Sequence, residues 1–108
     1  MEKSIRIEAG DQTEEFIQSL SDQELDQIEL KREFRSVTGL ASEPITSAVV
    51  IVLGGMTIEA ITRIIERWLE DRKEQQFLRL TLDGFDKSEV AGKEIAKLAE
   101  KYRQVSIS

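Results

Sequence analysis

The sequence contains no cysteine and no histidine, and these two absences exclude several kinds of chemistry. Without cysteine, the chain cannot form a disulfide framework, a thiolate zinc site or a cysteine nucleophile. Without histidine, it lacks the commonest metal ligand and the usual acid–base group near neutral pH. We therefore expect no catalytic residues, no metal site and no cofactor, and we expect that the protein is not an enzyme.

Proline and aromatic residues are also scarce. One proline and six glycines in 108 residues argue against a linker or an all-β protein dense in turns. Aromatic residues make up 6% of the chain, and the expected open face of the sheet carries one of them, Phe77, so we expect no surface on which nucleic-acid bases stack. Hydrophobic residues at 40% and charged residues at 33% are typical of a globular chain. The length predicts a single α/β domain over residues 1–108.

The chain has no strongly basic region and no apolar segment of membrane-spanning length. Its net charge is −6, and its basic residues are scattered among acidic ones, so we expect no nucleic-acid partner. The longest stretch without a charge lies between Glu43 and Glu59. It is shorter than the roughly 20 residues that span a bilayer. The first ten residues, MEKSIRIEAG, lack the apolar run of a signal peptide. We expect a cytoplasmic protein without stable membrane insertion.

The hydrophobic pattern predicts both strands and helices. Apolar and polar residues alternate in four segments, which we interpret as strands: 4–9, 27–35, 77–83 and 105–107. Capping residues and helical spacing predict three helices, at about 11–20, 57–75 and 86–102. Asp11, Thr57 and Asp86 are the expected N-caps.

The segment after Leu20 can be interpreted in two ways. Ser21 and Glu24 resemble a capping box, which would begin another helix. We favour a solvated loop followed by the strand at 27–35, because Glu29 and Glu33 would repel each other on one face of a helix.

The segment Ile45–Leu53 is apolar on every side and is also ambiguous. Pro44 before it suits the first turn of a helix, whereas its β-branched residues suit a doubly buried strand. Each predicted strand is apolar on one face only, which implies a sheet with helices on one side and water on the other. A strand apolar on both sides would expose apolar side chains on the open face. We therefore favour a helix, forming a hairpin with the helix after Gly54-Gly55.

These elements combine into an α/β (α+β) two-layer sandwich. The expected order is βαβ, helical hairpin, βαβ, with a four-stranded mixed sheet that carries its helices on one face. Such a small sandwich leaves little for a further apolar helix to pack against. We expect the apolar hairpin around Val49–Ile65 to bind a protein partner or a second copy of the chain. The candidate interface residues are Ile45, Val49, Val50, Val52, Leu53 and Ile58.

Two other candidate sites have simpler explanations. Gly54-Gly55 before a helix could hold a phosphate, so the alternative function is a small-molecule or nucleotide sensor. The pattern lacks the spacing of known phosphate loops, and we favour a turn followed by a Thr57 cap. Asp83, Asp86 and Glu89 provide too few ligands for a calcium loop and fit a turn with a capping box.

The middle of the chain resembles the effector-associated constant component family. The similarity lies in residues 49–61 (VVIVLGGMTIEAI), 65–73 (IERWLEDRK) and 78–82 (LRLTL). This succession matches the family's apolar segment, glycine-rich break, helix with a Trp-Leu pair and following strand. The resemblance implies a small accessory protein of bacterial conflict or signalling systems that couples to an effector encoded beside it. The apolar segment departs from the family in being β-branched, and the C-terminal part predicts strand then helix where the family has strand then strand.

Overall fold

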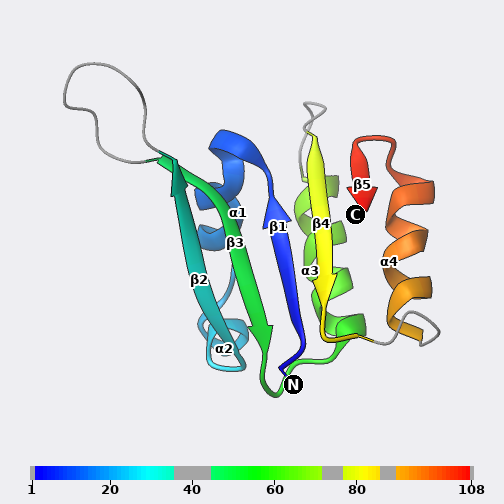
Figure 1. The fold of residues 1–108 in the computed structure, drawn as a ribbon, viewed down its shortest axis with the longest axis horizontal. Helices are drawn as coiled ribbons and strands as arrows, with labels where there is room; N and C mark the ends of the chain where they lie inside the picture. The colour runs from blue at the N-terminus through cyan, green and yellow to red at the C-terminus, as the bar shows by residue number, and fades with distance from the viewer. Residues whose placement is uncertain (1, 36–44, 72–76, 86–89, 108) are drawn as a thin grey trace.

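The chain forms an α+β fold around a mixed, open sheet of five strands (Figure 1). The computed structural model describes residues 2–35, 45–71, 77–85 and 90–107. The strands are β1 (Ser4–Glu8), β2 (Ile28–Arg35), β3 (Ile45–Leu53), β4 (Leu78–Asp83) and β5 (Val105–Ile107). Their order across the sheet is β2-β3-β1-β4-β5. Neighbouring strands are antiparallel except β4 and β5, which are parallel.

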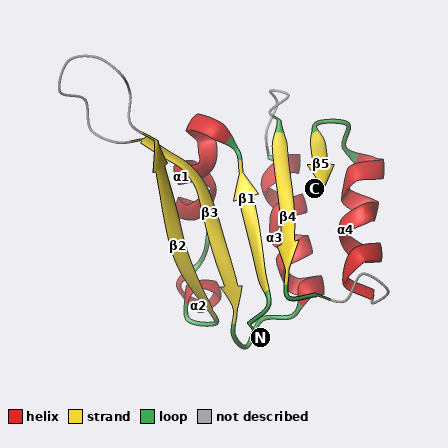
Figure 2. Ribbon diagram, in the orientation of Figure 1, coloured by secondary structure: helices red, strands yellow, loops and turns green. Residues whose placement is uncertain are grey.

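The helices build the second layer. They are the 3₁₀ turn η1 (Gly10–Gln12), α1 (Thr13–Gln18), α2 (Asp22–Leu25), α3 (Ile58–Glu70) and α4 (Val90–Lys101). Figure 2 shows α1, α2 and α3 behind the sheet, with α4 beside α3. The opposite face of the sheet carries none of the described helices. None of the helices in the described ranges is long and apolar enough to cross a membrane.

The prediction of a helix over Ile45–Leu53 is wrong, because this segment is strand β3. β3 lies between β1 and β2, so there is no helical hairpin, and the sheet has five strands rather than four. Val49 and Ile51 lie opposite Ile7 and Ile5 of β1 and face the helices.

The other face of β3 explains why a doubly apolar strand is tolerated on an open sheet. Val50 lies opposite Arg6 on β1 and Lys31 on β2, and Ala48 lies opposite Glu33. Long polar side chains on both neighbouring strands can cover the short apolar ones between them with their aliphatic stems. Ala48 is fully buried and Val52 is only 8% exposed.

The predicted amphipathic helices and strands are confirmed where the structure describes them. Thr57 caps α3, since its hydroxyl oxygen accepts a hydrogen bond from the backbone N–H of Ala60. The apolar face of α3 packs on the sheet, and Trp68 meets Phe16 edge to face with ring centroids 5.4 Å apart. α3 ends at Glu70, and its predicted continuation to Gln75 falls largely outside the described residues.

Two predictions about the N-terminal half are corrected. Asp11 does not cap α1, because η1 occupies residues 10–12 and no side chain caps the helix. The Ser21–Glu24 capping box is real and begins α2, so the predicted loop is a short helix. The strand that we favoured follows it as β2. The capping box and the alternating strand pattern are both correct, because α2 is only four residues long and ends before β2 begins.

Candidate protein-binding surface

The six predicted interface residues do not gather on one exposed surface. Val49 is fully buried on the helix side of β3, and Leu53 and Ile58 pack partly buried against the core. Val50 and Val52 face the open side, where Val52 is nearly covered. Ile45 begins β3, but its side chain is outside the described part. The described apolar side chains of this set are therefore largely packed within the domain.

The Gly54-Gly55 turn has little capacity left for a phosphate. The backbone N–H groups of both glycines donate to the carbonyl oxygen of Gln27, at 3.2 and 3.1 Å. The hollow beside the turn carries three acidic residues in its lining: Glu2, Asp26 and Glu29. A phosphate there would meet occupied donors and negative charge, so the geometry favours the simpler interpretation, a turn followed by a helix cap.

The acidic residues that we weighed as metal ligands are not brought together in the described part. Asp83 is exposed at the end of β4, whereas Asp86 and Glu89 lie outside the described residues. Among the described residues, no group of three or more acidic side chains is placed to hold a metal ion.

A shallow hollow of about 580 Å³ lies where β1 ends and β4 begins. Its lining includes Glu8, Asp11 and Arg79, together with Phe77, whose side chain is 87% exposed. The hollow combines both signs of charge, and its aromatic ring is exposed to solvent. It therefore shows no preference for one class of ligand.

The feature that the sequence did not reveal is the position of β2 at the margin of the sheet. Within the described residues β2 pairs only with β3 and lies at the margin of the sheet (Figure 1). The backbone N–H and C=O groups on its other side therefore have no ladder partner among the described residues. The strand is eight residues long. Glu29 and Lys31 lie on the open face, Leu30 packs partly against the core, and Phe34 is 57% exposed. A long edge strand of this kind is a template for pairing with another chain.

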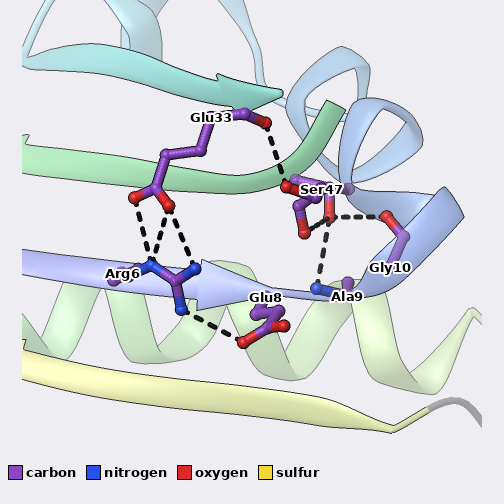
Figure 3. A network of polar contacts seen from close by, with 7 residues as sticks. Arg6, Glu8, Ala9, Gly10, Glu33 and Ser47 are labelled. Atoms are coloured by element: carbon purple, nitrogen blue, oxygen red, sulfur yellow. Dashed lines mark hydrogen bonds and ion pairs between the residues drawn. The ribbon is translucent and has the colours of Figure 1, made fainter. Parts of the chain in front are cut away.

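Two of the charges on β2 are held by partners within the domain. The guanidinium of Arg6 donates from Nε to both carboxylate oxygens of Glu33, at 3.1 and 3.0 Å, and from Nη2 to Oε1 at 3.0 Å. Its Nη1 donates to Glu8 (Figure 3). On the helix side, Arg32 donates to both oxygens of Glu14 at 3.1 Å. These hydrogen bonds hold the pKa of the Glu33 and Glu14 carboxyl groups below their usual range.

Three other charges on β2 have no such partner. Glu29, Lys31 and Arg35 are exposed and form no hydrogen bond or ion pair through their side chains with any described residue. They project from a strand whose position is fixed by its ladder with β3 and by the Arg6 and Arg32 ion pairs. The edge strand therefore presents three charged side chains in a fixed order, and none of them has a partner among the described residues.

A bulge in β3 fixes the end of β2. The register shifts between Glu33 and Phe34 because Ser47 is an extra residue on β3. The Ser47 hydroxyl donates to the backbone carbonyl of Glu33 at 3.3 Å (Figure 3). The Ser47 carbonyl accepts from the hydroxyl of Thr13, which is fully buried. The start of α1 is thereby tied to the end of the edge strand.

No family model, curated protein or solved structure matches this chain.

Proposed function

We propose that this chain is a non-enzymatic accessory module that binds a protein partner by strand addition at the free edge of β2. The observation that carries the proposal is an eight-residue strand at the sheet margin, paired on one side only within the described residues. In strand addition, the backbone groups of the edge provide affinity and the side chains on either face provide specificity. Both are present on β2.

This placement differs from the hairpin that the sequence suggests. Val49 and Ile65 at the two ends of that segment are fully buried, so they offer no surface to a partner without opening the core. β2 lies next to β3 in the sheet, so the proposed binding edge is adjacent to the segment that the sequence suggested. The apolar residues of β3 would then serve to hold the edge strand in place.

The resemblance of residues 49–61 to the effector-associated constant component family supplies the class of partner. In that family the accessory chain accompanies a bacterial effector encoded nearby. We propose that this chain couples to such an effector, and that the chain itself performs no chemistry.

The test is complex formation with the proteins encoded beside this chain, followed by amide hydrogen exchange. Each neighbour is co-expressed and co-purified, and exchange is compared between the free chain and the complex. We expect amides in β2 to gain protection, since unpaired edge amides exchange readily until they are paired. The charge reversal Lys31→Glu, on the open face of β2, should change the affinity of the complex, whereas Lys93→Glu, at an exposed position on α4, is the matched control and should not. A complex that protects another region and leaves β2 unchanged would refute the proposal.

A further inference from the structure

We infer that the edge strand β2 also pairs with β2 of a second copy of this chain, antiparallel, with Arg32 opposite Arg32 of the second copy. This inference rests on the proposed function, because it uses the same edge and names one partner for it. The pairing extends the sheet across both copies and keeps both helical layers on one side.

Symmetry limits the registers that two copies of β2 can adopt. Residues directly opposite each other in an antiparallel ladder point to the same face of the sheet. A twofold axis perpendicular to the sheet must therefore pass between two copies of the same residue, because adjacent residues point to opposite faces. Within residues 28–35, the longest overlap is obtained with either Lys31 or Arg32 on the axis.

Charge distinguishes these two registers. With Lys31 on the axis, Lys31 faces Lys31 of the second copy and Glu29 faces Glu33, so every charged pair on the open face is repulsive. With Arg32 on the axis, Lys31 faces Glu33 and Glu29 faces Arg35, and each attractive pair occurs twice. Opposite charges directly across a ladder stabilise it, whereas like charges destabilise it. The charge order of β2 is thus self-complementary in one register and self-repelling in the other.

The helix-side face agrees with the same register. Leu30 lies opposite Phe34 of the second copy, which would cover a ring that is 57% exposed in the single chain. The two Arg32 side chains on the axis are each neutralised by Glu14 of their own chain, with Nε 3.1 Å from Oε2. The Glu33 side chain remains 41% exposed in its ion pair with Arg6, so it is accessible to a second cation.

The free charges of β2 also explain how the edge avoids indiscriminate pairing. Charged residues on an edge strand disfavour association with apolar strands and with shifted registers. In the Arg32-centred register, Glu29, Lys31 and Arg35 all acquire partners. These are the three charges on β2 that have none among the described residues of one chain.

The test is a charge swap within one chain, measured by sedimentation equilibrium over a range of protein concentrations. We expect Glu29→Lys and Arg35→Glu each to weaken the dimer by about tenfold or more, because each creates two like-charge pairs across the twofold axis. The double variant restores both pairs with reversed sign and should return the dissociation constant to within about threefold of wild type. Both positions are exposed and unpaired in the described part, so we expect all variants to keep the wild-type circular dichroism.

Glu29→Lys separates this register from general charge effects. The substitution reduces the net charge of −6, which by itself favours association, so weakening would run against that trend. In the Lys31-centred register the same substitution would place a lysine opposite Glu33 of the second copy, and these attractive pairs would strengthen the dimer. Lys93→Glu on α4 controls for the opposite change in net charge.

The outcomes for the dimer and for the proposed function differ. A monomer at all concentrations, or a dimer that the double variant fails to restore, overturns the dimer. If a neighbouring protein still protects the β2 amides in that case, the proposed function stands. A dimer that neither Glu29→Lys nor Arg35→Glu weakens, and in which the β2 amides exchange as in the monomer, would use another surface. If no neighbouring protein protects the β2 amides either, both proposals are wrong.

Discussion

Replacing Thr13 with valine should destabilise the domain by several times more than the same replacement at Thr62. Both threonines are buried, at 0% and 6% exposure, and valine has nearly the same shape. The Thr13 hydroxyl accepts from the backbone N–H of Ala9 at 3.2 Å and donates to the carbonyl oxygens of Gly10 and Ser47 at 2.8 and 3.2 Å. Its loss would leave a buried donor and the bulge carbonyl without this partner.

The magnitude follows from the number of groups deprived of a partner. A buried donor or acceptor left unsatisfied costs about 1–3 kcal/mol, so two such groups amount to about 2–6 kcal/mol. The Gly10 carbonyl still accepts the backbone N–H of Thr13 and adds little. At Thr62 the hydroxyl donates to the carbonyl of Ile58 one turn earlier in α3. That carbonyl keeps its helical hydrogen bond, so Thr62→Val should cost less than about 1 kcal/mol.

The assay is urea unfolding followed by circular dichroism and by the fluorescence of Trp68, the one tryptophan in the chain. Agreement between the two probes and an unchanged denaturant slope would show two-state unfolding, so that the midpoints report stability. Because Thr13 is tied to the bulge at the end of β2, Thr13→Val should also speed amide exchange in β2. Equal losses of stability for Thr13→Val and Thr62→Val would refute the account of the bulge.

Two further predictions concern a turn and an ion pair. Gly84→Ala should destabilise the domain by about 1–3 kcal/mol relative to Gly55→Ala. Residue 84 has φ +81°, and a Cβ there would lie 2.5 Å from a backbone carbonyl oxygen. A Cβ at Gly55 meets nothing within 4 Å. Thermal unfolding of the two variants measures this, and equal midpoints would contradict it. Glu33→Gln should lower the thermal midpoint at pH 7, because the hydrogen bonds from Arg6 lower the pKa of Glu33 and so stabilise the folded state. The difference in midpoint between variant and wild type should shrink as the pH falls below 4.5, since the stabilisation is lost when the carboxylate is protonated. A difference that persists unchanged at about pH 3 would mean that the charge of Glu33 is not the cause.

The sequence by itself determined the elements whose signals are local. Alternation along β1, β4 and β5, the Thr57 cap and the apolar stripe of α3 with Trp68 all correspond to structure at the predicted places. These signals are local because side-chain direction repeats every two residues in a strand and every 3.6 in a helix. The placement of the helices on one face of the sheet followed from the same patterns, because the alternating strands are apolar on one side only.

Only the tertiary structure decided the nature of Ile45–Leu53 and the position of β2. An apolar segment with no periodicity fits a strand or a helix, and the choice depends on what covers its second face. Here Arg6 and Lys31 flank it from the two neighbouring strands of the sheet, β1 and β2. The edge position of β2 is likewise a property of strand order. The alternation of Glu29 and Lys31 with apolar residues predicted a strand. It did not predict that this strand has no neighbour on one side, because that depends on β3 lying between β2 and β1.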